Sequence, residues 1–362
     1  MIGNTIFVRG VAAVLIVLVH VNLVQRPDLD QWWPGGYWCV PLFAIPVPLF
    51  FLLAGYATRY GAEPKHTLWH RLRRLVPPLL VWNTGIVFLY SGIRVGSGEW
   101  LLFLLTGYWY LYFLFVLIQL YALQHFLARF GWVPEPRHLF LATVVMALVF
   151  FAIAALMLWT QGASAEFFES VLNRTIFPWA LFYCGGILLR QDPKWLRAIA
   201  RRRTVLAVLT VAGYLLFVAE LRAEGARFGY NPLQQFLMSG LIFKTSAILL
   251  LLSVLAQRSE SPNTSTHGRL LTTLGKEAYG IYLAHVPILL LVLGLYDWAG
   301  IQIPFSLEPP VLWLIAVFGA WGLVKIVRRL PVGWPGWLLF GIRSGKLRDI
   351  NKGSANRRHP SK

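Results

Sequence analysis

The strongest constraint on the fold is a series of apolar runs, each about as long as a helix that crosses a bilayer. A bilayer core about 30 Å thick needs roughly 20 apolar residues of helix. Runs of about that length, bounded by charges or by Pro and Gly clusters, occupy residues 5–24, 39–58, 75–92, 100–127, 139–159, 172–189, 204–221, 233–256, 274–295 and 307–327. The sequence therefore predicts an all-α, polytopic integral membrane bundle of about ten transmembrane helices, with the fourth broken at Gly107.

Composition excludes an ordinary soluble enzyme. Hydrophobic residues make up 57% of the 362 residues and charged residues 13%, against about 45–50% and about 25% in soluble domains. The first run has one early cation, Arg9, and no small-residue cleavage site after His20, so we expect a retained membrane helix rather than a signal peptide. Cys39 and Cys184 have no CxxC or Cys/His spacing around them, so we expect neither a disulfide framework nor a zinc site.

The distribution of cations predicts the orientation of the bundle. The chain has 33 Lys and Arg against 15 Asp and Glu, a net charge of +18, and cytoplasmic loops are enriched in Lys and Arg. Alternate loops hold most of the cations, at 59–74, 129–137, 190–203, 258–276 and after 325. Both termini are therefore predicted to be cytoplasmic, with a transmembrane domain at 1–330 and a flexible basic tail at 331–362. We expect membrane lipid, and no nucleic acid, to contact this charge.

Ionisable groups inside apolar runs are costly, and each one is a candidate for function. Arg9 and His20 lie eleven residues apart in the first run, so they fall on nearly one helix face, about 16 Å apart along the axis. His285 follows Tyr279 and Tyr282 in the ninth run, about 14 Å into the membrane by helical rise. The alternatives are that Arg9 anchors the helix at the cytoplasmic surface and that both histidines make helix-packing hydrogen bonds.

Two further groups of polar residues are candidates for binding. Lys244 lies near the middle of the eighth run, where we expect it to meet a carbonyl, a carboxylate or an anionic ligand. Arginines precede two prolines at the predicted cytoplasmic entry of the third span, where they either orient the helix and touch anionic lipid or bind phosphate; they are Arg71, Arg73 and Arg74, before Pro77 and Pro78. His66 and His70 have i,i+4 spacing but no third ligand nearby, so we expect no metal site.

Six motifs, in order and at compatible spacing, resemble those of the acyltransferase family 3 membrane proteins, over most of the chain. They are Arg9 followed after ten residues by His20, FFLLAGY at 50–56, RLRRLVP at 71–77, YWYL at 108–111, FPWALFYCGG at 177–186 and GKEAYGIYLAH at 275–285. Ala54 and Ala278 replace serines that are common in the family, so we assign neither position a hydroxyl role.

The resemblance implies a multi-pass O-acyltransferase of the bacterial cytoplasmic (inner) membrane. It would transfer an acyl group, expected to be acetyl, from cytoplasmic acyl-CoA to a hydroxyl of a carbohydrate or glycan. The implied roles are His20 as general base, Arg9 holding the donor or stabilising developing charge, and His285 as a second base or pocket hydrogen bond. CoA phosphates would bind Arg71, Arg74 and Arg73, and a polar channel would be lined by Tyr282, Trp109, Lys244, Asn83 and Gln119.

Two other functions fit the same residues. A transporter or flippase for a glycan or small metabolite would also have about ten spans, buried polar residues and basic loops. A membrane sensor or scaffold would make His20 and His285 structural. The acceptor, the acylated position, the acyl-chain length, an acyl-enzyme intermediate, the oligomeric state and the partner of Lys244 stay open at this point.

Overall fold

The computed structural model describes residues 5–25, 36–58, 60–61, 67–91, 96–161, 173–228, 237–257, 266–301, 303, 307–330 and 334–341. All regular secondary structure within these residues is helical, which confirms the all-α prediction. In chain order the elements are α1 Thr5–Gln25, α2 Gly36–Phe43, α3 Pro46–Ala57, α4 Thr67–Ile86, the π-helix η2 Val87–Ser91, α5 Gly98–Thr106, the 3-10 helix η3 Trp109–Leu111, α6 Tyr112–Arg129, α7 Pro136–Gln161, α9 Ala180–Gln191, α10 Pro193–Arg201, α11 Arg203–Phe228, α12 Met238–Gln257, α13 Thr266–Lys276, α14 Ala278–Ala299, α15 Glu308–Arg329 and α16 Trp334–Phe340.

Several helices are long and apolar enough to cross a membrane, as predicted. Within the described residues there are seven such stretches, Val40–Ala57, Trp109–Arg129, Pro136–Leu156, Arg203–Ala223, Met238–Leu255, Ala278–Ala299 and Glu308–Arg329, and Thr5–Val21 is a shorter apolar helix. The chain is therefore a multi-pass membrane protein. The total of about ten spans and the cytoplasmic position of both termini stay predictions.

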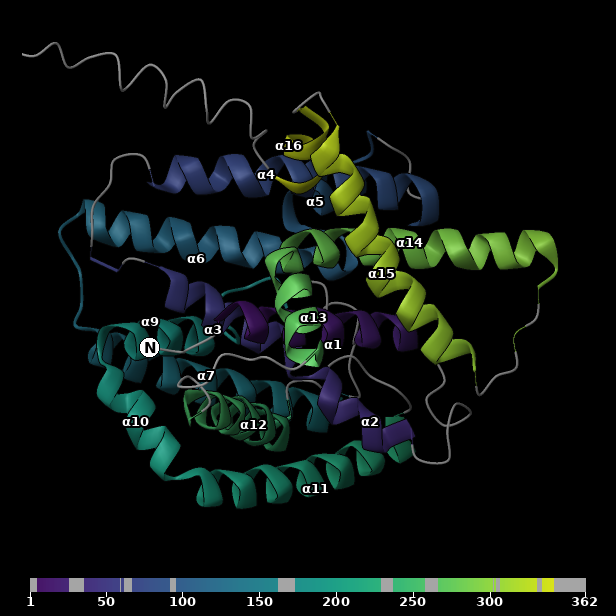
Figure 1. Cartoon of the computed structure of the whole chain (residues 1–362). Coiled ribbons are helices and arrows are strands. Elements are labelled where there is room, and N and C mark those ends of the chain that lie inside the picture. The colour runs from purple at the N-terminus through teal and green to yellow at the C-terminus, as the bar shows by residue number, and fades with distance from the viewer. Residues whose placement is uncertain are drawn as a thin grey trace, which may run out of the picture.

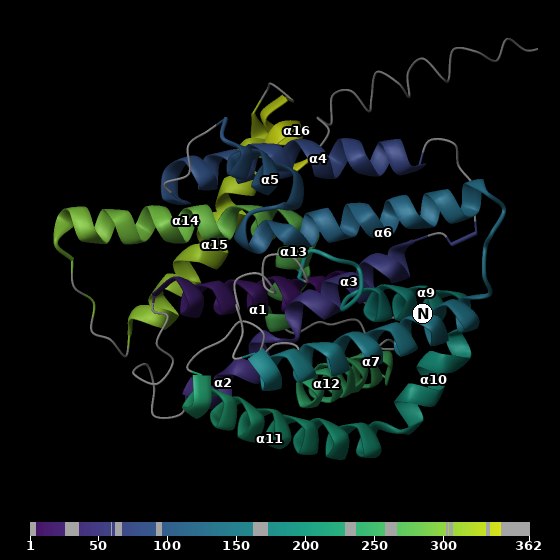
Figure 2. The same ribbon diagram turned by 180° about the vertical axis from the view of Figure 1, so that it is seen from behind.

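Most of the long helices run side by side, along the horizontal direction of Figure 1, and the view from behind in Figure 2 shows the same arrangement. On one side of the bundle lie α10, α11 and α12, and on the opposite side lie α4, α5 and α16. Between them runs α1, which contacts α2, α3, α13, α14 and α15. The helix that carries Arg9 and His20 is therefore at the centre of the molecule.

Two glycines fix the crossing of α1 and α13. A Cβ atom at Gly10 would lie 2.0 Å from the carbonyl oxygen of Leu271, and one at Gly275 would lie 1.8 Å from the carbonyl oxygen of Ile6. Small residues of this kind let helix backbones approach closely in a membrane, where lipid removes the hydrophobic drive for association. Any larger side chain at either position would push α1 away from α13.

The break predicted at Gly107 is confirmed. Gly107 has a φ of 82° and ends α5, and the chain forms η3 before α6 begins. A second break divides the predicted ninth run at Glu277, between α13 and α14. The buried carboxylate of Glu277 pairs with Lys325 and Arg328 of α15, at 3.2 and 2.7 Å. This pairing fastens the start of α14 to α15.

The start of the third predicted span differs from the prediction. Pro77 and Pro78 were expected to open the span, but α4 begins at Thr67, so both prolines lie inside it. The arginine cluster is therefore part of the same helix and not of an entry turn. Each interior proline removes one backbone hydrogen bond from a helix, and the partners that replace these bonds are described below.

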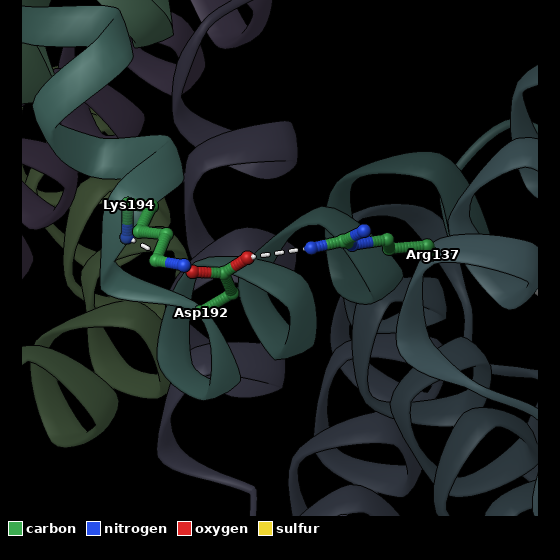
Figure 3. A network of polar contacts seen from close by, with 3 residues as sticks. All are labelled: Arg137, Asp192 and Lys194. Carbon is green, nitrogen blue, oxygen red and sulfur yellow. Dashed lines mark hydrogen bonds and ion pairs between the residues drawn. The ribbon is translucent and has the colours of Figure 1, made fainter.

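The junction of α9 and α10 is held by Asp192, which accepts two hydrogen bonds (Figure 3). One oxygen accepts from the backbone N–H of Lys194 at 3.1 Å, which caps the first turn of α10. The other accepts from Nη2 of Arg137 on α7 at 3.2 Å. The Lys194 amide and the Arg137 guanidinium together hold the pKa of the Asp192 carboxyl below its ordinary value. This loop is thus fastened to α7.

Part of the predicted tail is helical. Within 331–362 the chain forms α16, which packs against α4 (Figure 1). Residues 342–362, where most of the tail's cations lie, are outside the described residues.

Candidate functional site

Two buried histidines meet at the centre of the bundle. His20 of α1 and His285 of α14 are 265 residues apart in sequence, yet His20 Nδ1 lies 3.0 Å from His285 Nε2. Both side chains are buried. The pairing joins two residues that the sequence had singled out separately.

The backbone contacts of the pair assign a proton to each Nδ1. His20 Nδ1 lies 2.8 Å from the carbonyl oxygen of Ile16, and His285 Nδ1 lies 3.1 Å from that of Ile281. A carbonyl oxygen only accepts hydrogen bonds, so each Nδ1 must carry the hydrogen. In the neutral pair, the single Nδ1 hydrogen of His20 is then shared between the Ile16 carbonyl oxygen and His285 Nε2, which both accept it, and His20 Nε2 is left without a proton. His20 Nε2 is therefore the atom able to act as a base.

Aromatic rings form the walls around the histidine pair. The ring centroids of Trp109 and Tyr110 lie 5.8 and 5.5 Å from that of His20, both edge to face. The Tyr110 hydroxyl donates to the carbonyl oxygen of Leu283 at 2.8 Å, and the Tyr282 hydroxyl donates to the carbonyl oxygen of Tyr110. These two bonds tie α14 to η3. The predicted channel residues Tyr282 and Trp109 are thus both part of the histidine site.

The turn that carries Trp109 is strained and is held from several sides. Trp109 has a φ of 50°, a left-handed conformation that costs a bulky residue about 1–2 kcal/mol. Asn83 of α4 accepts from the backbone N–H of Tyr108 at 2.8 Å and donates to the carbonyl oxygen of Phe103. Its amide thus binds both sides of Gly107, and Asn83 positions the turn. Strain of this kind persists only where the surroundings fix it.

Arg174 adds a further hold on the same turn. Its Nε donates to the carbonyl oxygen of Gly107 at 3.1 Å, and its guanidinium carbon lies 5.3 Å from the ring centroid of Phe103. Gln119 of α6 in turn donates to the carbonyl oxygen of Arg174 at 2.7 Å. Gln119 was predicted to line a channel, but its described hydrogen bond goes to this backbone.

A second group of residues, which we call the arginine cluster, surrounds Tyr121 of α6. The guanidinium carbon of Arg71 lies 4.2 Å from the centroid of the Tyr121 ring, and the Tyr121 side chain also interacts electrostatically with Arg9 and Arg74. Arg9 and Arg74 are near enough for their like charges to repel each other. The Arg71 guanidinium thus lies on the Tyr121 ring, and the charges of Arg9 and Arg74 are close enough to act on the same side chain. Arg71 and Arg74, three residues apart, share a face of α4.

A hydrogen-bonded chain continues from the arginine cluster into α3 and α9. Arg71 Nη1 lies 3.5 Å from Gln124 Oε1, which accepts from the Tyr183 hydroxyl at 2.9 Å. That hydroxyl lies 3.2 Å from the Thr58 hydroxyl. Gln124, Tyr183 and Thr58 were not predicted as site residues. Gln124 and Thr58 lie near the ends of their apolar runs, and Tyr183 lies within a run among apolar residues. Tyr121 and Gln124 are three residues apart and share a face of α6, and this spacing could have indicated both of them as site residues.

The described contacts of two predicted site residues, Arg73 and Lys244, lie outside both the histidine pair and the arginine cluster. Arg73 lies on a different face of α4, with its guanidinium carbon 4.5 Å from the ring centroid of Trp69. Lys244 is buried on α12, where its Nζ lies 4.8 Å from the ring centroid of Phe151 on α7. Neither contact involves the arginine cluster or the histidine pair. His66 lies outside the described residues, which contain no group of three side chains able to ligate a metal.

One helix connects the two groups. Arg9 belongs to the arginine cluster and His20 to the histidine pair, and both are on α1, about 16 Å apart along its axis. Helix α14 also reaches both groups, because it carries His285 and because the hydroxyl of its Tyr279 donates to the carbonyl oxygen of Arg74 at 3.4 Å. Helix α6, which carries Tyr121, directly follows η3. The arrangement can bind an anion at one point and move a proton at another.

The chain is similar in sequence to known proteins. A family model described as an acyltransferase domain matches residues 5–326. Similar proteins include the probable poly-beta-1,6-N-acetyl-D-glucosamine export proteins of Staphylococcus aureus strains MSSA476, MW2 and N315, each 22% identical over 233 residues. The match covers 59% of this chain and 64% of each relative, so the chain spans less than two thirds of these curated relatives. No solved structure matches the chain significantly.

Proposed function

Because the chain belongs to the acyltransferase 3 family of membrane proteins, we propose that it transfers an acyl group, expected to be acetyl, from acyl-CoA to a hydroxyl of a carbohydrate. The observation that carries the proposal is the buried His20–His285 pair, in which His20 Nε2 carries no proton, together with the position of His20 on the helix that also brings Arg9 to the arginine cluster. The first group supplies a base and the second a site for phosphates. An acyl transfer from a nucleotide-bearing donor needs both.

His20 acts as the general base. Its Nε2 takes the proton of the acceptor hydroxyl while that oxygen attacks the thioester carbonyl. When the tetrahedral intermediate collapses, the carbon–sulfur bond breaks, the ester is released, and the imidazolium returns its proton to the departing CoA thiolate. His285 Nε2, 3.0 Å from His20 Nδ1, stabilises the imidazolium formed in the first step. His285 is thus a positioning residue rather than a second base.

Arg71, Arg74 and Arg9 bind the phosphates of the donor. Arginine suits this role because its planar fork binds phosphate oxygens bidentately. The pantetheine arm would then run from the arginine cluster along α1 toward His20. Arg9 is assigned to donor binding, because its charge lies near that of Arg74 and near Tyr121 and because it is about 16 Å along α1 from His20. The predicted cytoplasmic orientation of this end would face the compartment in which CoA is made.

The acceptor we propose is a polysaccharide of the bacterial envelope. The support for it is the printed name of the relatives, which refers to a poly-N-acetylglucosamine. Trp109, partly exposed beside His20, is suited to stack on a sugar ring. A multi-pass protein of the bacterial inner membrane is the setting in which such a polymer and cytoplasmic acyl-CoA are both accessible.

The test uses purified protein in detergent or nanodiscs with acetyl-CoA and candidate envelope polysaccharides. Release of free thiol that depends on the acceptor, and a mass gain of one acetyl group on the product, are the expected results. His20→Ala should lower kcat by about 100- to 10,000-fold. Full turnover by His20→Ala would exclude the base assignment.

Binding of the acyl-CoA donor can be tested by comparing alanine substitutions of three arginines on α4. Arg71→Ala and Arg74→Ala should raise the KM for acetyl-CoA by about ten-fold or more, because each removes a charge-assisted hydrogen bond to phosphate. Arg73→Ala removes the same charge from the same helix, but its side chain packs on Trp69, so its effect should be much smaller. Equal effects of all three substitutions would reduce the cluster to a nonspecific attraction for anions.

Polysaccharide export is the second candidate function, favoured by the printed name of the relatives. It predicts that proteoliposomes move a labelled oligosaccharide across the bilayer with no thiol release from acetyl-CoA. Under that function His20→Ala would leave transport unchanged, whereas acyl transfer without transport would exclude export as the primary activity.

A further inference from the structure

Two consecutive prolines leave two carbonyl groups of α4 without their usual helical partners. In an α-helix the carbonyl of residue i accepts from the N–H of residue i+4. Proline has no N–H, so Pro77 and Pro78 cannot donate to the carbonyls of Arg73 and Arg74. These two carbonyls lie within the turn that carries Arg71 and Arg74, in a chain where unsatisfied backbone groups are costly.

Both carbonyls are bonded by side chains from distant parts of the sequence. Trp337 Nε1 of α16 donates to the carbonyl oxygen of Arg73 at 3.0 Å. The Tyr279 hydroxyl of α14 donates to the carbonyl oxygen of Arg74 at 3.4 Å. The replacement donors thus match, one for one, the two bonds that the prolines remove.

Other contacts hold α16 in register with this turn. Trp82 Nε1 donates to the carbonyl oxygen of Leu339 at 2.7 Å, and the ring centroids of Trp82 and Phe340 lie 6.0 Å apart. Gly341, with a φ of 60°, ends α16 so close to α4 that a Cβ there would lie 2.2 Å from the carbonyl oxygen of Arg74. Figure 1 shows α16 beside α4 on the outer side of the bundle. Helix α16 is thus closely packed and hydrogen-bonded against α4.

We propose that α16 is a positioning element of the donor site, and that Trp337 and Tyr279 fix the α4 turn that presents Arg71 and Arg74 to acyl-CoA. The donor role of the two arginines rests on the proposed function. The assignment of Trp337 and Tyr279 as hydrogen-bond donors to the Arg73 and Arg74 carbonyls does not depend on that function. A helix with two interior prolines is prone to kink, and the direction of that kink sets where the guanidinium groups point.

The test combines a substitution of each hydrogen-bonding side chain with a substitution of the proline whose missing N–H it replaces. Trp337→Phe keeps an aromatic side chain but removes the N–H, and it should lower the unfolding midpoint by about 2 to 4 °C. In a Pro77→Ala background the new N–H of residue 77 can bond to the Arg73 carbonyl, so Trp337→Phe should then have little effect. Trp334→Phe, at an α16 tryptophan that is 63% exposed, is the matched control and should have little effect in either background.

Tyr279→Phe provides an independent second arm. It removes the donor to the Arg74 carbonyl, and Pro78→Ala should rescue it specifically. Pro77→Ala should not rescue Tyr279→Phe, and Pro78→Ala should not rescue Trp337→Phe. This crossed pattern would not arise from a general loss of packing.

Steady-state kinetics test whether the contact between Trp337 and the Arg73 carbonyl affects binding of acetyl-CoA. Trp337→Phe should raise the KM for acetyl-CoA by about three- to ten-fold while kcat at saturating donor stays within about two-fold, because the histidine pair is untouched. Pro77→Ala should reverse that increase. Equal loss of stability in both backgrounds, or a fall in kcat without a change in KM, would overturn the proposal. If wild-type protein consumes no acyl-CoA, the proposed function fails and the donor-site role of α16 fails with it, and the stability rescue still decides whether Trp337 and Tyr279 bond to the two carbonyls of α4.

Discussion

Replacing Gly10 with alanine tests how closely the catalytic geometry depends on the crossing of α1 and α13. A Cβ at position 10 would lie 2.0 Å from the carbonyl oxygen of Leu271, whereas ordinary contacts begin at 3.4 Å. The obstacle is backbone on both sides, so no side-chain rotation relieves it. The two helices must therefore separate by about 1.4 Å at this point.

The displacement reaches both groups of the site because α1 carries both. His20 Nδ1 lies 3.0 Å from His285 Nε2, and a shift of α1 by about 1 Å or more takes that pair beyond hydrogen-bond distance. Misplacement of a catalytic group by about 1 Å can lower a rate about 100-fold. Overpacking should also lower the free energy of unfolding by about 1–3 kcal/mol. We therefore expect Gly10→Ala to lose about 100-fold in kcat while remaining folded.

Steady-state thiol release from acetyl-CoA, with unfolding monitored in parallel, measures both effects. Gly294→Ala is the matched control, since a Cβ at Gly294 on α14 has nothing within 4 Å. It should retain wild-type kcat and stability. The reasoning would be refuted if Gly10→Ala kept wild-type turnover, or if Gly294→Ala lost as much.

Three further substitutions test other parts of the structure. His285→Leu should lower kcat about 10- to 100-fold by removing a hydrogen bond to the His20 imidazolium; a loss as large as that of His20→Ala would instead make His285 a base. Asn83→Ala should reduce kcat about ten-fold or more by releasing the strained Trp109 turn, and wild-type kinetics would contradict this. Asp192→Asn should destabilise slightly at pH 7, and the difference from wild type should vanish as the pH falls through the lowered carboxyl pKa, below about 3.9; a difference that persists in acid would exclude the carboxylate as its cause.

The all-α membrane architecture and the main candidate site residues could be predicted from the sequence, because both follow from the free-energy cost of placing polar groups in lipid. Apolar runs of span length are needed wherever lipid is the solvent, and an ionisable group within one is retained only for a reason. That argument selected Arg9, His20 and His285 individually. It carried no information on partners, because the 265-residue separation of the two histidines is closed only by the packing of α14 against α1.

The remaining site residues were hidden because their roles depend on tertiary contacts. Gln124 lies near the end of one apolar run and Tyr183 within another, and only the folded structure brings Gln124 to Arg71 and Tyr183 to Gln124. The helix α16 is too short to register as a span, and its α4 partner begins before the apolar run that marked it. The bend at Gly107 could be predicted from glycine alone, whereas the Asn83 and Arg174 bonds that hold it could not.

The placement of Arg9 and His20 on one helix gives α1 a mechanical role in the proposed reaction. A donor whose phosphates bind at one point and whose thioester reacts at another requires a fixed distance between the two, and a single helix supplies about 16 Å of it by its rise alone. Every contact that locates α1 therefore acts on phosphate binding and on proton transfer together. Substitutions at the α1–α13 crossing should consequently change KM for the donor and kcat jointly, whereas those at α16 should change KM alone. The proposed placement of Arg9 and His20 on one helix requires this difference between the two kinetic patterns. A site in which separate helices carried the phosphate-binding group and the base would not produce it.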